Sequence, residues 1–306
     1  MDKGAKISLV GTGRVGSAVA FSTLIKGLAK EMVLVDYNPK AAEGDALDLL
    51  HASCFAQPVD VRGGDYPDTK DSDIVIISAS IPMKDIKSRL DLCQGNVELF
   101  KQIIPKIAQA SPNAIIILIT NPLDIMTYAA LKISGFPKER VIGTGTLIDS
   151  GRFRSLVANA AHINPEEIHA YIIGEHGDSQ FPVLSRANVG GRKFRERAKP
   201  KIEEFFEQTK KGGYLVMEKK GFTNYAIALS TTTLVECIVK DLKKIYPVST
   251  LVNDYYGVSD LCISVPTIIG SGGAERVIDL ELDENEIKKF QDSAKILKDI
   301  TTSLKF

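Results

Sequence analysis

Four short runs in the first half of the chain are almost continuously hydrophobic. They lie at residues 5–10, 31–36, 73–78 and 114–120. They are rich in Ile and Val and lack the alternation of a half-exposed strand, so they suit a parallel sheet that is covered on both faces. Helical patterns at 17–28 and 41–50 separate them. This alternation predicts a doubly wound α/β sheet, which a further strand at 140–144 would complete.

The second half of the chain has a different pattern. We expect a strand at 168–173, a hairpin turn at 188–192, helices at 201–211 and 225–242, and two strands around the glycine-rich turn at 270–273. Asp283 and Glu286 form the capping box of a last helix, with apolar positions at helical spacing. The prediction is a parallel-sheet domain at 1–143 and an α+β domain with antiparallel sheets at 144–306. Without a linker-like stretch between them, the two would share a large interface.

Composition excludes several classes of function. The chain has 306 residues, more than one typical core, and its 38 basic and 38 acidic residues balance, which argues against a nucleic-acid partner. Its four cysteines are far apart and form no CxxC pair, so we expect reduced thiols and no metal site. There is no signal-peptide pattern and no apolar stretch long enough for a bilayer, so we expect a cytoplasmic protein without a membrane partner.

A glycine-rich loop follows the first expected strand. Residues 11–16 read GTGRVG, the pattern GxGxxG, and open the first expected helix. Gly11 permits a tight turn, Gly13 lets the backbone approach a pyrophosphate, and Gly16 lets the helix pack against the sheet. Asp36 ends the second strand twenty residues after Gly16. Its carboxylate would bind a ribose 2′-OH and repel a 2′-phosphate, so the prediction is NAD rather than NADP. A non-catalytic NAD-binding regulator would carry the same loop.

Only one of the four histidines lies between glycines. His176 belongs to the sequence GEHGD at 174–178, where a turn after a strand would expose an imidazole able to transfer a proton near neutral pH. Arg152 follows Asp149 in the sequence DSGR at the start of an expected helix. An arginine there could hold a carboxylate through two parallel hydrogen bonds. A surface Asp–Arg pair fits the spacing equally well, and the two interpretations stay open.

Taken together, these motifs resemble those of the L-lactate dehydrogenases in the lactate/malate dehydrogenase family, over nearly the whole chain. The matching segments, in order, are 11–16, Asp36, 88–92, 120–124, 135–138, 143–146, 149–154, 174–178 and 247–250. The resemblance implies hydride transfer between NAD and the C2 carbon of a small 2-oxo or 2-hydroxy acid. The expected fold is then a Rossmann domain followed by a catalytic α+β domain.

The resemblance also implies roles for individual residues. His176 donates the proton to the ketone, Asp149 holds its other ring nitrogen, and Arg152 binds the substrate carboxylate. Arg89, on a mobile loop at about 81–90, polarises the C2 carbonyl when the loop closes. Asn121 contacts the carbonyl and the nicotinamide, and its bond to Pro122 is a candidate cis peptide. Thr223 and Ile227 line the nicotinamide side. The implied cofactor-binding residues are Gly11, Gly13, Arg14, Val15, Gly16, Asp36, Tyr66, Ala79 and Asn121.

The position that selects the substrate departs from the family pattern. Six residues before Arg89, lactate enzymes carry Gln and malate enzymes carry Arg, whereas this chain has Met83. The usual Pro-Gly of the loop is Asp85-Ile86 here. A second substrate carboxylate would meet a thioether, and an unpaired buried charge is very unfavourable. Lys84 is the one residue that could pair with it. We therefore expect activity on pyruvate, with tolerance for larger apolar side chains such as that of 2-oxoisocaproate.

Alternative functions differ in what they require. Within the family, a 2-hydroxyisocaproate-type activity is the main alternative and malate activity is less favoured. An NAD-dependent glycosidase would need a metal held by Cys and His, and no such pairing is present. The resemblance further implies a homodimer or homotetramer. Arg154 and His169 match positions that bind fructose 1,6-bisphosphate in many bacterial relatives, although ordinary interface residues would look the same.

Overall fold

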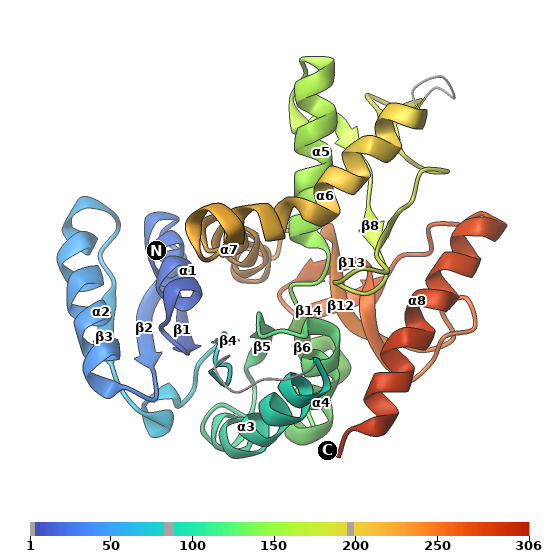
Figure 1. Ribbon diagram of the computed structural model, residues 1–306. Coiled ribbons are helices and arrows are strands. Elements are labelled where there is room, and N and C mark those ends of the chain that lie inside the picture. Colours follow the sequence, from blue (N-terminus) through green and yellow to red (C-terminus); the bar gives the residue numbers. More distant parts are fainter. Residues whose placement is uncertain (1–3, 83–88, 195–198, 306) are drawn as a thin grey trace.

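One nine-stranded sheet runs through the molecule, with helices on its faces (Figure 1). The computed structural model describes residues 4–82, 89–194 and 199–305, with only the main chain of 89, 199 and 200. The parallel part of the sheet consists of β1 (Ala5–Val10), β2 (Ala29–Val35), β3 (Asp60–Gly63), β4 (Ile74–Ile77), β5 (Ile115–Leu118) and β6 (Val141–Gly143). Its order is β3-β2-β1-β4-β5-β6. This order confirms the doubly wound dinucleotide-binding fold.

The last residues of these parallel strands lie side by side. Val10 pairs with both Val35 and Ile77, and Leu118 pairs with both Ile77 and Gly143. The loops that follow the strands therefore meet along one carboxyl edge of the sheet. In doubly wound sheets, ligands bind outside this edge.

Helices connect and cover the strands. They are α1 (Arg14–Ile25), α2 (Pro39–Ala52), α3 (Arg89–Ala110), α4 (Leu123–Ser134), α5 (Leu147–Ala161), α6 (Lys199–Lys220), α7 (Tyr225–Val239) and α8 (Glu284–Ser303). Short 3-10 helices lie at Ser53–Phe55, Tyr66–Thr69, Lys138–Arg140 and Pro165–Glu167. In the described part of the chain, no helix is both long enough and apolar enough to cross a membrane.

The antiparallel strands extend the same sheet. β12 (Lys244–Val252) pairs with β6 through Ser249 and Gly143, and β13 (Leu261–Gly270) and β14 (Gly273–Val277) continue outward. The antiparallel sheet expected for the second half is thus present, and it is continuous with the parallel one. The pairing of β12 with β6 joins the two halves of the chain within one sheet.

The single strand expected at 168–173 is wrong. β7 (Ile168–His169) pairs with β10 (Asn188–Val189), whereas β8 (Ile172–Ile173) pairs with β9 (Phe181–Pro182). The run is divided because its two ends join different sheets. The hairpin expected at 188–192 is confirmed by the antiparallel pair of β10 with β11 (Arg192–Lys193).

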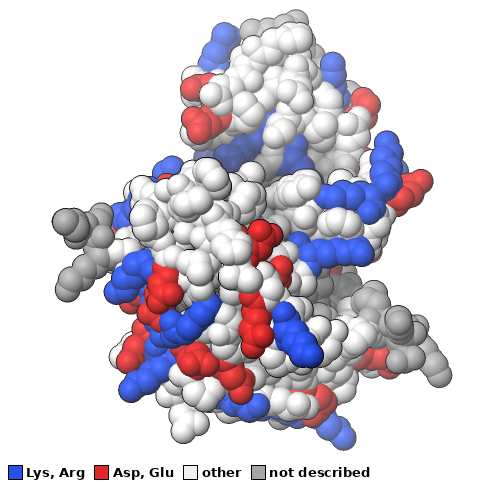
Figure 2. Space-filling view, turned by 90° about the vertical axis from the view of Figure 1, so that its left-hand side faces the viewer, with Lys and Arg blue, Asp and Glu red and all other residues white. Residues whose placement is uncertain are grey.

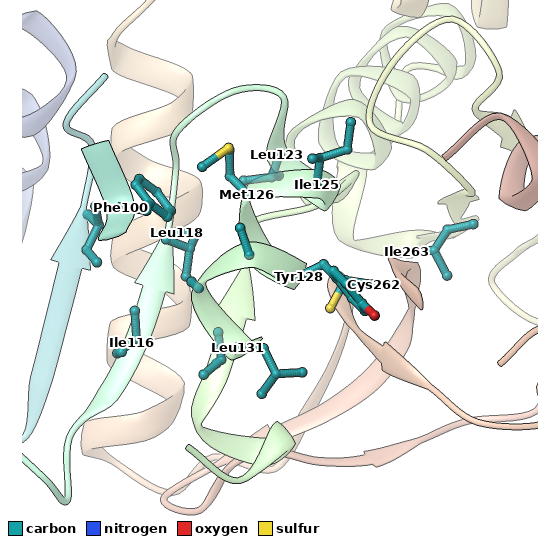
Figure 3. Close-up of a cluster of buried hydrophobic side chains, with 14 of the residues drawn as sticks. Phe100, Ile116, Leu118, Leu123, Ile125, Met126, Tyr128, Leu131, Cys262 and Ile263 are labelled. Atoms are coloured by element: carbon teal, nitrogen blue, oxygen red, sulfur yellow. The ribbon is translucent and has the colours of Figure 1, made fainter. Parts of the chain in front are cut away.

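One of the hydrophobic core clusters surrounds helix α4. Figure 3 shows members of this cluster from α3, β5, α4 and β13, among them Phe100, Leu118, Leu123 and Ile263. Every residue of α4 from Leu123 to Leu131 is buried. This packing fixes the first turn of α4, which carries the buried residue Asp124.

The C-terminal helix forms as its sequence predicts. The Asp283 carboxylate accepts the Glu286 N–H at 2.8 Å, and the Glu286 carboxylate accepts the Asp283 N–H at 3.2 Å, which confirms the capping box of α8. Phe290, Ala294 and Leu297 are buried against the core. On the face that includes α2, Figure 2 shows both signs of charge interspersed with uncharged surface.

Candidate active site and cofactor loop

The glycine loop is shaped by close packing at two of its three glycines. Gly11 has φ +95°, and a Cβ atom built on it would lie 2.6 Å from the Ala79 nitrogen. A Cβ atom on Gly16 would overlap the carbonyl oxygen of Gly11. A Cβ atom on Gly13, in contrast, has no neighbour within 4 Å. Gly11 and Gly16 are therefore required for close packing of the loop. Gly13 instead leaves open space in front of the helix.

The N-terminus of α1 is suited to an anion. Its N-cap is Gly13, no side chain caps it, and its first turn contains no acidic residue. The N–H groups of this turn, from Arg14, Val15 and Gly16, and the positive end of the helix dipole can therefore hold a pyrophosphate. These features fit the pyrophosphate of NAD.

Asp36 is held at the same edge of the sheet. Its carboxylate accepts the N–H groups of Thr12 at 2.8 Å and of Asn38 at 3.0 Å. Each oxygen keeps a further lone pair for a ribose hydroxyl. Burial and the charge of Asp65 raise the pKa of the Tyr66 phenol. The charge of Asp36 contributes further to this rise, so Tyr66 lies near Asp36. The positions expected to bind NAD thus converge at the carboxyl ends of β1, β2 and β4.

A stacking contact links the loop to the segment before α7. The guanidinium of Arg14 lies 4.2 Å from the ring centroid of Phe222. Thr223 follows in the same segment and is half-buried, as is Ile227 in the first turns of α7. Ala79 lies two residues after β4, and its N–H donates to the Val10 carbonyl oxygen at 3.1 Å. The loop and the segment before α7 therefore lie close together.

One buried carboxylate joins the expected proton donor to the expected substrate-binding arginine. Asp149, in the first turn of α5, is 2% exposed. Its Oδ2 lies 2.8 Å from Nδ1 of His176, and its Oδ1 accepts from the Arg152 guanidinium at 2.8 Å. The structure thus brings together three residues that the sequence leaves far apart or ambiguous. The second interpretation of Asp149 and Arg152, a surface ion pair, is wrong because the carboxylate is buried.

The charges in this cluster stabilise one another. Burial alone would raise the pKa of Asp149, but His176 and Arg152 bring it below its usual value. Burial alone would lower the pKa of His176, but the charge and hydrogen bond of Asp149 raise it above its usual value. Asp149 is therefore ionised at neutral pH, and the imidazole is held in a state that readily keeps a proton. With Nδ1 occupied, Nε2 is the nitrogen free to act on a ligand.

Asn121 follows β5 at the same edge. It is exposed, and its bond to Pro122 is cis, as the sequence predicts. Its carbonyl oxygen accepts from the Asn96 side chain at 2.8 Å, and Asn96 also accepts the Ile81 N–H at 2.8 Å. Asn96 therefore ties the segment that follows β4 to the end of β5.

Some of the expected residues fall outside the described part. Met83 and Lys84 lie outside it, as does most of the loop expected at 81–90. Arg89 is the first residue of α3, and its side chain is likewise not among those described. The expected roles of Met83 and Arg89 therefore stay predictions.

Arg154 and His169 line separate hollows. Arg154, on α5, borders a groove of about 1150 Å³ between α5, α6 and α7. His169, on β7, is exposed and borders a hollow of about 250 Å³ beside Tyr171 and Arg186. Within one protomer, the structure does not bring the two residues into a common cavity.

Sequence reasoning missed several residues near the site. Asp124 Oδ2 accepts the main-chain N–H of His176 at 2.7 Å, and Glu175 is 1% exposed with its N–H donated to Ser293 at 2.8 Å. A Cβ atom on Gly212 of α6 would lie 3.2 Å from Cδ of Arg152. In the sequence, these residues could have been identified as two acidic residues inside recognised motifs and as part of a Gly-Gly pair in a long helical pattern.

The fold, the cofactor loop and the Asp149–His176 pair define an NAD-dependent oxidoreductase that acts on a CH–OH group. Comparison with known proteins agrees. Residues 5–143 match the family model described as lactate/malate dehydrogenase, NAD binding domain, and residues 146–305 match the one described as lactate/malate dehydrogenase, alpha/beta C-terminal domain. The chain belongs to the lactate/malate dehydrogenase family. NAD as cofactor is thereby confirmed.

Individual relatives are similar over their full length. The chain is 42% identical to L-lactate dehydrogenase 1 of Clostridium acetobutylicum, over 99% of this chain and 100% of that protein. It is 41% identical to an L-lactate dehydrogenase of Clostridium perfringens, over 97% and 96%. Among solved structures, it matches the minor L-lactate dehydrogenase of Enterococcus mundtii in a ligand-bound form, with TM-score 0.96, 34% identity and 99% coverage of both chains.

Proposed function

We propose that this enzyme interconverts pyruvate and L-lactate and also accepts 2-oxo monocarboxylic acids with larger apolar side chains. The observation that carries the proposal is the Asp149 carboxylate, which contacts both the His176 imidazole and the Arg152 guanidinium at 2.8 Å. This arrangement sets a proton donor beside a cation that can hold a carboxylate. The relatives named L-lactate dehydrogenase support the same substrate class.

Each residue of the cluster has a distinct part in the reaction. Arg152 has five N–H donors and gives one to Asp149, so the remaining donors can bind the substrate carboxylate. His176 donates a proton from Nε2 to the C2 carbonyl oxygen, which becomes the hydroxyl oxygen. In the reverse direction, His176 accepts this proton again. Asp149 stabilises the imidazolium and fixes the orientation of the ring. When bound, the reduced cofactor NADH would supply a hydride to C2, and the oxidised cofactor NAD would accept the hydride in the reverse direction.

Further residues would orient the substrate and exclude water. Asn121 is exposed at the same edge, where its side chain can donate to the C2 carbonyl oxygen. Arg89, at the start of α3, would add a positive charge near that oxygen. Thr223 would line the side toward the cofactor.

The preference for apolar side chains depends on Met83. A thioether offers no charge to a second carboxylate, so oxaloacetate would leave that carboxylate unpaired. An apolar group contacts Met favourably, and each methylene changes the discrimination by only about 1–3 kcal/mol. A 2-hydroxyisocaproate-type preference is the main alternative because the flexible Met side chain can yield to a larger group.

Steady-state kinetics on a panel of 2-oxo acids tests this proposal. We expect kcat/KM with NADH to be high for pyruvate, within about tenfold of that value for 2-oxoisocaproate, and much lower for oxaloacetate. A Met83→Arg variant is the matched test of the selecting position and should raise the relative activity on oxaloacetate. A wild-type preference for oxaloacetate would refute the proposal, and a preference for 2-oxoisocaproate would favour the alternative.

Self-association and effector binding extend the proposal. A homodimer or homotetramer would cover the apolar side chains that border the groove between α5, α6 and α7, such as Leu215 and Leu229. Fructose 1,6-bisphosphate would bind where Arg154 and His169 of different protomers approach each other. Activity measured against the sugar bisphosphate tests the effector, and an unchanged KM for pyruvate at saturating effector would contradict it.

A further inference from the structure

A second buried carboxyl group contacts His176 through its main chain. Asp124 lies in the first turn of α4 and is 2% exposed. Its Oδ2 accepts the N–H of His176 at 2.7 Å, and its Oδ1 lies 3.4 Å from the hydroxyl of Ser264 on β13. The contact joins a helix of the parallel half of the sheet to the turn that carries the imidazole. No part of the reaction derived above uses this group.

We propose that Asp124 is a positioning residue for His176, whose carboxylate fixes the main chain of the turn and whose negative charge stabilises the protonated imidazole. The inference rests on the proposed role of His176 as the proton donor. It assigns Asp124 no contact with the substrate or the cofactor.

The hydrogen bonds of the turn support the role of Asp124 in fixing the main chain at His176. The turn is held at three successive residues: Gly174 forms a two-way bridge with Ser264 at 3.0 and 3.1 Å, Glu175 N–H donates to Ser293 at 2.8 Å, and His176 N–H donates to Asp124. The last bond is the one at the residue that carries the ring. Asp149 orients the imidazole from one side, and Asp124 fixes the main chain to which the imidazole is attached.

The charges around Asp124 support its role in stabilising the protonated imidazole of His176. Burial raises the pKa of Asp124 to about 6, while the Ser249 hydroxyl and the His176 N–H and charge act in the opposite direction. The other ionisable groups that face it are Glu175, whose charge raises this pKa further, and the buried thiol of Cys262. Asp124 is thus mainly ionised at neutral pH. After Asp149, its charge is a further cause of the raised pKa of His176, against which Arg152 acts.

An isosteric substitution separates charge from position. Asp124→Asn keeps an oxygen that can accept the His176 N–H but removes the negative charge. For pyruvate reduction, which needs protonated His176, we expect the alkaline limb of kcat/KM to move to lower pH by about one unit. Lactate oxidation, which needs the neutral ring, should retain more activity at acidic pH. Asp124→Glu keeps the charge but moves it, so it should lower kcat while leaving the alkaline limb near its original pH.

Asp260→Asn is the matched control. Asp260 also holds α4, through Lys132 and Tyr128 at 3.0 Å each, but it has no contact with the turn of His176 among the described residues. We expect its pH profiles to match those of the unmodified enzyme. If Asp124→Asn folds and its profiles in both directions equal those of the unmodified enzyme, the inference is overturned.

A titration of the unmodified enzyme decides the question if Asp124→Asn does not fold. The chain has four histidines, and a His176→Asn variant assigns the His176 Cε1 resonance by its disappearance. We expect this resonance to show a second inflection near pH 6, from protonation of Asp124, in addition to its own titration. A single inflection would overturn the inference. If the enzyme reduced no 2-oxo acid, the proposed function would fail, yet this titration would still report on Asp124.

Discussion

A Cβ atom on Gly16 would overlap the carbonyl oxygen of Gly11, so the first helix can approach the first strand only without a side chain at this position. Gly16→Ala should therefore force the start of α1 away from β1. We expect the free energy of unfolding to fall by about 1–3 kcal/mol, as in other overpacked sites. NADH binding should weaken as well, because the N–H groups of the first turn move. Chemical denaturation and a fluorescence titration with NADH measure the two effects.

Gly13→Ala is the companion variant for the same loop. Gly13 has φ −64°, which alanine adopts freely, and its added Cβ atom would have no protein neighbour within 4 Å. We expect unchanged stability and weaker NADH binding, since the methyl group would occupy the space through which the pyrophosphate approaches. Unchanged NADH affinity in Gly13→Ala would argue against this placement of the cofactor.

Replacing Asp149 should damage catalysis far more than cofactor binding. Asp149→Asn removes the charge that raises the pKa of His176 and that pairs with the Arg152 guanidinium. We expect kcat for pyruvate reduction to fall about 100-fold or more, with the alkaline limb of its pH profile displaced to lower pH. The dissociation constant of NADH should stay within about twofold, because Asp149 lies on α5 and outside the glycine loop. A kcat within a few-fold of the unmodified enzyme would contradict the proposed role.

Local patterns were sufficient for the cofactor loop but not for the whole site. Gly11, Gly13 and Asp36 could be predicted because two consecutive strands, with the turn and the helix between them, determine their positions. The pairing of Asp149 with Arg152 could not be decided from spacing, since burial of the carboxylate depends on α6 and on the turn of His176. Asp124 received no role because its contact with His176 joins positions 52 residues apart in the chain.

The fold was predictable where a strand is apolar along its length. β4 and β5 meet this condition, and their positions were predicted within two residues. β12 was not predicted because Pro247 interrupts its run, and proline is unusual within a strand. It is accommodated because Pro247 lies opposite Pro266 of β13. The strand expected at 168–173 failed for another reason, since pairing partners that lie later in the chain divide it.

The apolar rim of the groove between α5, α6 and α7 should be needed for assembly. Leu229 on α7 is 55% exposed and borders this groove together with Leu215 and Val216 of α6. Leu229→Asp should leave the protomer folded, because the side chain is already exposed, but should disfavour burial against a second copy. Light scattering after size exclusion should then find a smaller species. Ile296→Asp, on α8 with 42% exposure, is the control and should leave the assembly unchanged. Equal masses for both variants and the unmodified protein would count against this interface.

The buried charge of Asp124 should lower the stability of the enzyme at neutral pH. Because the pKa of Asp124 is raised from 3.8 to about 6, the folded protein binds this proton more tightly than the unfolded chain does. The contribution of Asp124 to the free energy of unfolding therefore falls as the pH rises from about 4 to about 6, and it stays low above that range. Asp124→Asn has no such proton, and groups other than His176 titrate alike in both proteins. We expect the free energy of unfolding of the variant, relative to that of the unmodified enzyme, to increase by about 2–3 kcal/mol between pH 4 and pH 7. Urea denaturation at the two pH values measures this difference, and a value independent of pH would show that Asp124 is not the titrating group.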